Sequence, residues 1–409
     1  MRQCCFSWGL LGLALFLAPL SARAGDAEWP GWRGPNRDGK SPDKGLLDEW
    51  PPEGPKLLWK FDKLGKGFST VAVSKGRVYS TGDRDGNLKI FAFDMSGNPV
   101  WEIDHDKAWT GDPGGSRSTP TISDGNLYLI SGHGLVGCYD AKSGKQVWTA
   151  SLRDLGGDVP GWGYAESVLI LGNAAVVTPG GKNCIAALDK KTGKTLWTSK
   201  GFDAGANYSS CVAFNYEKIP LIVNGTGGGI VCVSARDGLV QWSNDFSAGN
   251  TANCPTPAYS DGYVFWANGY GKGGICMKLE KGKGKVSAEE AWTTDKMDCH
   301  HGGYIIHDGY IYGNNGGQWV CLDLKTGARK WKDRGVGKGS VVFADGKLFL
   351  FGENDGLAGL GTASPSGLNM KGTFKVKGSG PSWAHPVVIG GRLYLRYDTN
   401  LYCFDVKGK

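Results

Sequence analysis

Only one long apolar run occurs in the sequence, and it is too short to cross a membrane. Residues 8–20 form this run, and Arg2 places a positive charge before it. A spanning helix needs about 20 apolar residues, whereas a secretory signal peptide needs about 7–15 before a small-residue cleavage site. Residues 22–24 (Ala-Arg-Ala) supply such a site. We therefore expect residues 1–24 to be a signal peptide cleaved near Ala24, and the chain to be periplasmic or secreted, without a transmembrane segment.

Clusters of basic residues are also missing, although the chain carries a formal net charge of +7. The lysines are spread along the chain, and many stand in turns, as Lys145 and Lys194 do. A protein that binds nucleic acid gathers its positive charge on one face. The sequence therefore predicts no nucleic-acid partner.

The 11 cysteines lack the spacings that bind zinc or c-type haem. No Cys-x-x-Cys pair is present, and the one adjacent pair, Cys4-Cys5, lies in the predicted signal peptide. Five other cysteines recur at or near one position of a repeat, where we expect small buried hydrophobes; they are Cys138, Cys232, Cys276, Cys321 and Cys403. A serine nucleophile elbow and a phosphate loop are absent too, so catalytic residues stay unassigned, and the sequence predicts no metal site.

Glycine and tryptophan, by contrast, are abundant, with 67 and 16 residues. They mark a repeat whose copies include GLVGCYDAKSGKQVW, KNCIAALDKKTGKTLW and GGQWVCLDLKTGARKW. An aromatic residue closes each of eight units, namely Trp59, Trp101, Trp148, Trp197, Trp242, Trp292, Trp331 and Phe374. Repeats of about 40–50 residues with four short strands are typical of propeller blades.

The sequence of one unit predicts its strands and turns. Asp-Gly between apolar runs indicates a first hairpin, and an Asp followed by Thr/Ser-Gly before the closing Trp indicates a second. Residues 399–409 contain a strand and its turn but not the strand that would pair with it. Residues 57–62 can supply that missing strand, so we expect the two ends of the chain to complete one blade together. We predict an all-β fold, an eight-bladed propeller of four-stranded antiparallel blades, closed by pairing of the N- and C-terminal strands.

Residues 25–56 lie outside the repeats and are rich in glycine and proline. They carry Trp29, Trp32 and Trp50, which a disordered linker would not need. We expect an extended strap packed on the propeller. The predicted organisation is a signal peptide (1–24), a strap (25–56) and one propeller domain (57–409).

One mouth of the propeller channel is predicted to bind a ligand. The residues just before the innermost strand of each blade surround this mouth, and here they are polar and aromatic. The candidate site residues are Arg117, Trp162, Glu166, Tyr208, Asn253, His300, His301, Lys338, Trp383 and His385. The alternative is that these side chains only satisfy backbone groups and waters in a narrow channel.

Two motifs at this mouth stand out. Gly302 and Gly303 follow the two histidines and permit close backbone approach, so a histidine there could bind an anion, a metal ion or a proton. Cys211, Cys254 and Cys299 fall at the mouth on successive blades. With His300 they would approach a soft-metal site, but packing of small residues is the favoured interpretation.

The hairpin signature, clearest at 188–197, resembles the pyrroloquinoline quinone (PQQ) repeat. WRGPNRDG, WGYAES, CHHGGYI and WAHP resemble motifs of exported PQQ-like propeller proteins. The resemblance extends to BamB-type propellers, which bind partners without a cofactor, and more distantly to quinoprotein alcohol dehydrogenases. The dehydrogenases hold PQQ between a Trp and an adjacent Cys-Cys disulfide, with Ca²⁺ and an Asp base. That resemblance would make Glu166 and Asn253 the Ca²⁺ ligands, Trp162 or Trp383 the stacking residue, and Asp298 the nearest base.

The sequence favours a binding or scaffold propeller, non-catalytic and monomeric. The expected partner is a protein, a small molecule or a polymer at one face of the propeller, and no cofactor is expected. The alternative is a quinoprotein oxidoreductase that uses PQQ with Ca²⁺.

Overall fold

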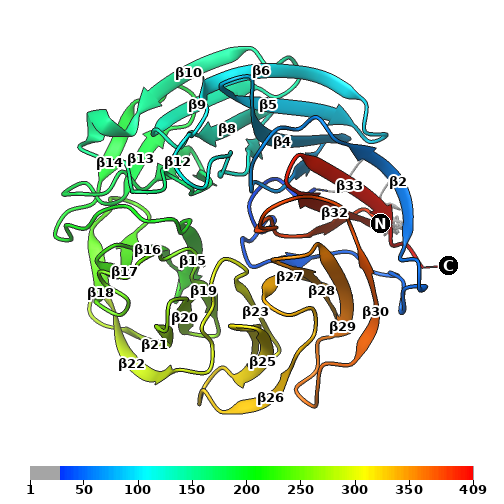
Figure 1. The fold of residues 1–409 in the computed structure, drawn as a ribbon. Coiled ribbons are helices and arrows are strands. Elements are labelled where there is room, and N and C mark those ends of the chain that lie inside the picture. The colour runs from blue at the N-terminus through cyan, green and yellow to red at the C-terminus, as the bar shows by residue number, and fades with distance from the viewer. Residues whose placement is uncertain (1–27, 409) are drawn as a thin grey trace, which may run out of the picture.

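The computed structural model describes residues 28–408 and consists of eight β-sheets arranged in a ring (Figure 1). Every sheet contains four antiparallel strands, and one sheet gains a fifth, parallel strand from the N-terminal segment. The all-β, eight-bladed propeller that the repeats predict is confirmed. Among residues 28–408 no helix is long and apolar enough to span a membrane. The predicted signal peptide, residues 1–24, lies outside the described residues.

Blades 1 to 4 follow one another along the chain. Blade 1 contains β3 (Ala72–Ser74), β4 (Arg77–Arg84), β5 (Asn87–Asp94) and β6 (Pro99–Lys107). Blade 2 contains β7 (Thr121–Ser123), β8 (Asn126–Ile130), β9 (Leu135–Asp140) and β10 (Gln146–Ser151), and the 3₁₀ helix η1 (Leu152–Leu155) follows it. Blade 3 contains β11 (Leu169–Leu171), β12 (Ala174–Val177), β13 (Ala186–Asp189) and β14 (Thr195–Thr198). Blade 4 contains β15 (Val212–Tyr216), β16 (Ile219–Thr226), β17 (Gly229–Ser234) and β18 (Val240–Asn244).

Blades 5 to 8 complete the ring. Blade 5 contains β19 (Ala258–Ser260), β20 (Tyr263–Asn268), β21 (Gly273–Lys281) and β22 (Val286–Thr294). Blade 6 contains β23 (Tyr304–His307), β24 (Tyr310–Asn315), β25 (Gln318–Asp323) and β26 (Arg329–Asp333). Blade 7 contains β27 (Gly339–Ala344), β28 (Lys347–Gly352), β29 (Leu357–Thr362) and β30 (Met370–Lys375), with β1 (Lys40–Ser41) added. Blade 8 contains β31 (Val387–Ile389), β32 (Arg392–Tyr397), β33 (Asn400–Asp405) and β2 (Lys56–Phe61).

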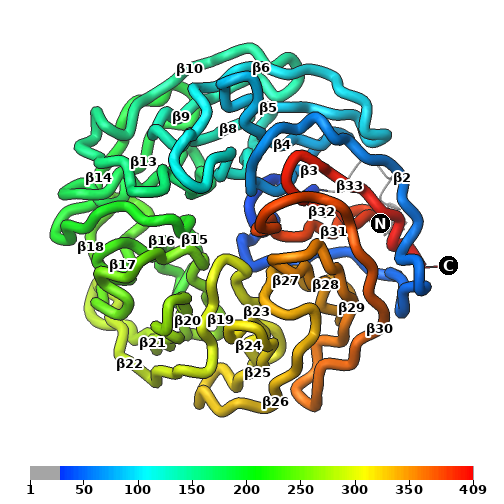
Figure 2. The backbone as a smooth tube through the Cα atoms, viewed as in Figure 1, coloured from blue at the N-terminus to red at the C-terminus, as the bar shows by residue number. Residues whose placement is uncertain are grey.

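Blade 8 closes the ring by joining the two ends of the chain, as predicted. Strand β2 pairs antiparallel with β33, and Trp59 lies opposite Cys403. Figure 2 shows this junction as blue beside red backbone. Closure leaves no open sheet edge between the first and last repeats, which would otherwise invite pairing with another chain.

Five of the seven closing tryptophans pack on the turn glycine of the next blade. The Trp59 ring of blade 8 covers Gly97 of blade 1, where an added Cβ would meet the ring at 2.5 Å. The Trp59 indole Nε1 also donates a hydrogen bond of 3.1 Å to the carbonyl oxygen of Met95 in the same turn. The same contact recurs in the pairs Trp101–Gly144, Trp148–Gly193, Trp197–Gly238 and Trp292–Gly327. These five tryptophans therefore join neighbouring blades as well as ending their own.

Substituting Gly97 with alanine is expected to weaken this joint. Gly97 and Gly86 have nearly equal positive φ angles, +82° and +80°, but a Cβ at Gly86 meets no atom within 4 Å. Both Ala variants bear the backbone cost of a positive φ, about 1–2 kcal/mol. Only Gly97→Ala must also displace Trp59, which adds about 1–3 kcal/mol. Urea denaturation of both variants measures the difference in their free energies of unfolding. Equal losses of stability would show that the Trp59 ring moves aside at no cost.

The recurring cysteines serve the packing role that the sequence predicts. Cys138, Cys232, Cys276, Cys321 and Cys403 are fully buried and pair across the strands with the closing Trp of their own blade. All nine cysteines of the described chain are free thiols. A small side chain beside each large indole keeps the blade interior filled.

Residues 28–56, the described part of the strap, run through the channel and along blade 7. Strand β1 pairs in parallel with β27, the innermost strand of that blade, and deep-blue backbone lies beside β27 in Figure 1. Arg33 donates to the carbonyl oxygen of Tyr304 in blade 6, while Arg37 donates to those of Ser167 and Cys211, before blades 3 and 4. The strap thus crosses the channel and ties several blades together.

Candidate functional site

A cavity of about 380 Å³ opens at the predicted mouth of the channel. Six of the ten predicted site residues line it, namely Arg117, Trp162, Tyr208, His300, His301 and Trp383. Its remaining walls include Phe68, Cys254, Tyr270 and, from the strap, Trp32. We call this space the mouth cavity. Its volume lies within the range of about 300–1,000 Å³ typical of small-molecule pockets.

Aromatic rings form two walls of the mouth cavity. On one side, the Trp383 ring lies between Phe68, 4.7 Å away between centroids, and His301, 4.2 Å away and stacked. On the other side, Trp162 packs against Tyr208 at 5.7 Å and is 36% exposed. Large flat rings with open faces bind flat ligands by stacking.

Arg117 brings a positive charge to the cavity and is held in place by backbone. Its guanidinium donates to the carbonyl oxygens of Trp162 at 2.5 Å, Pro113 at 2.6 Å and Gly115. The group also lies 5.5 Å from the Trp109 ring. Burial lowers the pKa of Arg117 to about 10, which leaves the side chain charged at neutral pH.

Two of the other predicted residues, Glu166 and Asn253, are buried and bonded within the protein. The Glu166 carboxylate accepts hydrogen bonds from the backbone N–H and the hydroxyl of Thr178. The Asn253 amide oxygen accepts from Ser247 at 2.8 Å, and its nitrogen donates to the Thr226 carbonyl at 2.8 Å. Neither residue lies among the cavity walls.

His385 and Lys338 are not among the cavity walls. The His385 ring is buried, and its Nε2 lies 2.9 Å from the His301 carbonyl oxygen. The Lys338 ammonium lies 3.3 Å from Oε1 of Glu353. The ligand-binding role of the ten residues stays a prediction, and the structure brings six of them together at one cavity.

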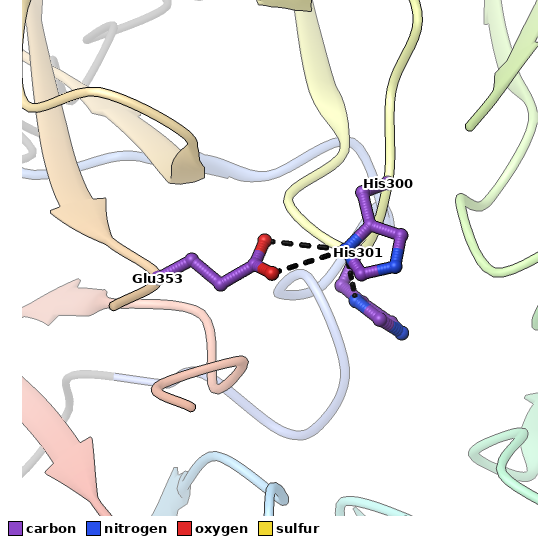
Figure 3. Close-up of side chains that lie close together, drawn as sticks. All are labelled: His300, His301 and Glu353. Atoms are coloured by element: carbon purple, nitrogen blue, oxygen red, sulfur yellow. Dashed lines mark hydrogen bonds and ion pairs between the residues drawn. The ribbon is translucent and has the colours of Figure 1, made fainter. Parts of the chain in front are cut away.

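His300, His301 and Glu353 form the most polar feature of the mouth, which we call the His–Glu cluster (Figure 3). Nδ1 of His300 lies 3.2 Å from each Glu353 carboxylate oxygen. Nδ1 of His301 lies 2.7 Å from Nδ1 of His300. Burial opposes charge on Glu353, but the hydrogen bond and charge of His300, with the charges of Lys338 and His301, lower its pKa to about 2. Glu353 is therefore a carboxylate at neutral pH.

The loops around the cluster require glycine. A Cβ at Gly302 would lie 1.7 Å from the Gly339 carbonyl oxygen of blade 7, so the histidine loop presses directly on its neighbour. Gly303 has a φ of +65°, and a Cβ there would meet the Arg33 guanidinium of the strap at 2.6 Å. The two glycines after the histidines thus permit the close approach that the sequence predicts.

Glu353 and Tyr270 are site residues that the sequence reasoning missed. Each follows the second strand of its blade, β28 or β20, rather than preceding the first strand. The first two strands of a blade form an antiparallel hairpin, so the second strand ends at the channel mouth where the first begins. Including the turns after the second strands among the predicted mouth segments would have identified both residues.

The sequence and the fold resemble known propellers. Residues 84–333, more than half of the chain, match the family described as outer membrane protein assembly factor BamB. No match is found among curated proteins.

Solved structures with the same fold share little sequence with this chain. BamB from Moraxella catarrhalis is 15% identical with a TM-score of 0.59, covering 86% of this chain and 99% of its own. Quinohemoprotein alcohol dehydrogenase from Comamonas testosteroni is 15% identical with a TM-score of 0.67, covering 93% and 81%. Quinohemoprotein alcohol dehydrogenase ADHIIG from Pseudomonas putida HK5 is 14% identical with a TM-score of 0.66, covering 94% and 81%. At this level of sequence identity the similarity shows a shared fold only.

Proposed function

This chain belongs to the family described as outer membrane protein assembly factor BamB, and on that premise we propose that it is a non-catalytic binding propeller that holds a planar, anionic small molecule in the mouth cavity. The observation that carries the proposal is the cavity itself, with aromatic walls and the half-buried cation of Arg117. Trp162, which is 36% exposed, offers a ring face for stacking, and Arg117 attracts negative charge. Export through the signal peptide stays a prediction of the sequence.

The quinoprotein alternative rests on the shared fold, and the residues present do not fit its cofactor site. Ca²⁺ requires free oxygen ligands, whereas the Glu166 and Asn253 oxygens already accept protein hydrogen bonds away from the cavity. Cys254 is the one cysteine that lines the described cavity, and the only adjacent cysteine pair of the sequence is Cys4-Cys5. We therefore derive no reaction through PQQ or Ca²⁺.

A protein partner is the second candidate, and exposed apolar side chains favour it. Val100, Val147, Leu196 and Leu239 are each 45–53% exposed, at or beside the outermost strands of blades 1 to 4. Most apolar residues of comparable size in the described chain are buried. Exposed apolar surface of this kind is used for protein contacts when it is contiguous.

A thermal-unfolding titration with PQQ, used as a planar tricarboxylate probe, tests the proposal. Saturating ligand at about 100–1,000 times Kd would stabilise the native state by about 3–4 kcal/mol. We expect this stabilisation to be unchanged by Ca²⁺ or a chelator and to be weakened in Trp162→Ala. Leu196→Ala removes an exposed apolar side chain outside the cavity and is the matched control.

Two other outcomes would contradict the proposal. Stabilisation that needs Ca²⁺ and disappears in Glu166→Gln would support the quinoprotein alternative. Absence of any response to PQQ and to other planar aromatic carboxylates would leave the protein partner as the favoured candidate.

A further inference from the structure

The His–Glu cluster brings three electron-donating atoms to one point. Donor atoms of His300, His301 and Glu353 all lie within 4.8 Å of one another. The histidines precede β23 in blade 6, and Glu353 follows β28 in blade 7. Figure 3 shows the carboxylate and the two rings directed toward each other across the gap between these blades.

A single hydrogen serves these contacts poorly. Nδ1 of His300 faces Nδ1 of His301 at 2.7 Å and both oxygens of Glu353 at 3.2 Å. An imidazole Nδ1 carries at most one hydrogen. If that hydrogen points to Glu353, the lone pair of His301 Nδ1 reaches the same hydrogen only through a bent, shared hydrogen bond. If His301 donates instead, the His300 lone pair faces the carboxylate oxygens unshielded.

A cation between the three groups removes this conflict, because every lone pair can then point at it. We propose that His300, His301 and Glu353 bind a divalent first-row transition metal ion, with Zn²⁺ as the representative. Two imidazole nitrogens and one carboxylate oxygen are the ligands of many zinc and iron sites, whereas Ca²⁺ takes oxygen ligands only.

The spacing of the donor atoms is close to that of a metal site. Zinc bonds of about 2.0–2.1 Å at tetrahedral angles separate the ligand atoms by about 3.3 Å. The two distances between His300 and Glu353 are already 3.2 Å. The separation of the histidine nitrogens, 2.7 Å, must widen by about half an ångström, which a small rotation of either ring provides.

Neighbouring groups orient the ligands as metal sites require. The Tyr270 hydroxyl lies 3.1 Å from Nε2 of His300, so the ring can give its Nε2 hydrogen to oxygen and keep Nδ1 for the metal. His301 is stacked on Trp383, and His385 bonds to its backbone carbonyl. Lys338 contacts Oε1 of Glu353 and leaves Oε2 for the cation.

The metal ion would have an open position toward the mouth cavity. Both histidines line that cavity, and three protein ligands leave at least one coordination position unfilled. This inference goes beyond the proposed function, because metal binding needs only the chain itself. The sequence predicts no metal site, since Glu353 stands 52 residues beyond His301 and no spacing rule connects them.

The test uses the metal-stripped, untagged protein with Zn²⁺ and Co²⁺ as probes. We expect one Zn²⁺ to bind per chain in calorimetry, and Co²⁺ to give the visible absorption of a site with nitrogen and oxygen ligands. His301→Ala and Glu353→Gln should each weaken Zn²⁺ binding by at least about tenfold, since even residues outside the ligand set change affinity by that factor. His307→Ala is the matched control and should bind Zn²⁺ unchanged, because His307 pairs with Asp308 away from the cluster.

The proposal and the proposed function can fail separately. Equal Zn²⁺ affinity in His301→Ala, Glu353→Gln and the unchanged protein would show adventitious binding and overturn the metal site. Absence of Zn²⁺ binding and of Co²⁺ absorption in the unchanged protein would overturn it without depending on whether any variant folds. The response to PQQ is measured on the metal-free protein, so it reports on the cavity alone.

Discussion

Arg37→Ala should lower the free energy of unfolding by about 3–5 kcal/mol, among the largest effects of any single substitution in this chain. Arg37 is buried in the channel, where its Nη1 donates to the carbonyl oxygens of Ser167 and Cys211 at 2.9 Å each. Its Nη2 donates to the carbonyl oxygen of Val168. Removing the guanidinium takes this donor from the Ser167 and Cys211 carbonyls, while Val168 keeps its bond from Thr121, and leaves a void between the strap and blades 3 and 4.

Urea denaturation measures the loss, and two further variants separate its causes. Arg236 is exposed, and Arg236→Ala should change stability by no more than about 0.5 kcal/mol. Arg37→Lys keeps a charge but lacks the planar fork, so we expect it to recover only part of the loss. A loss below about 1 kcal/mol in Arg37→Ala would show that the strap does not need this anchor.

The second large effect is a pH dependence that comes from Glu166. Burial raises the pKa of Glu166 from 4.5 to about 7, although Thr178 and the charge of Arg37 favour the carboxylate. Between pH 4.5 and 7 the folded chain therefore keeps a proton that the unfolded chain releases. The stability that this proton provides is complete below about pH 4.5 and is lost as the pH rises through about 7. The unfolding free energy of the unchanged protein should fall by about 2–3 kcal/mol relative to Glu166→Gln between pH 5 and pH 8.

Denaturation of both proteins across this pH range checks the prediction. Thr178→Ser keeps the hydroxyl that bonds to Glu166 and carries no titrating group, so its difference from the unchanged protein should be independent of pH. A difference between the unchanged protein and Glu166→Gln that stays constant from pH 5 to pH 8 would mean that Glu166 is ionised throughout.

The mouth of the channel shows how far sequence reasoning reaches. Six of the ten side chains chosen from the segments before the innermost strands line one cavity. Glu166 and Asn253 come from the same segments but turn into the blades, where Thr178 and Thr226 supply partners. Side-chain direction within a loop depends on contacts with the neighbouring blade, which no local pattern records.

The amino-acid sequence by itself determined the number of blades, the strands within each, the closing aromatic residues and the joining of the two chain ends. Those features depend on period, alternation and turn chemistry, which act between residues close together along the chain. Only the tertiary structure decided that the strap would cross the channel and that Glu353 would meet His300 and His301. Such contacts join blades 6 and 7 to each other and to the N-terminal segment, and they exist only when the closed ring brings distant residues together.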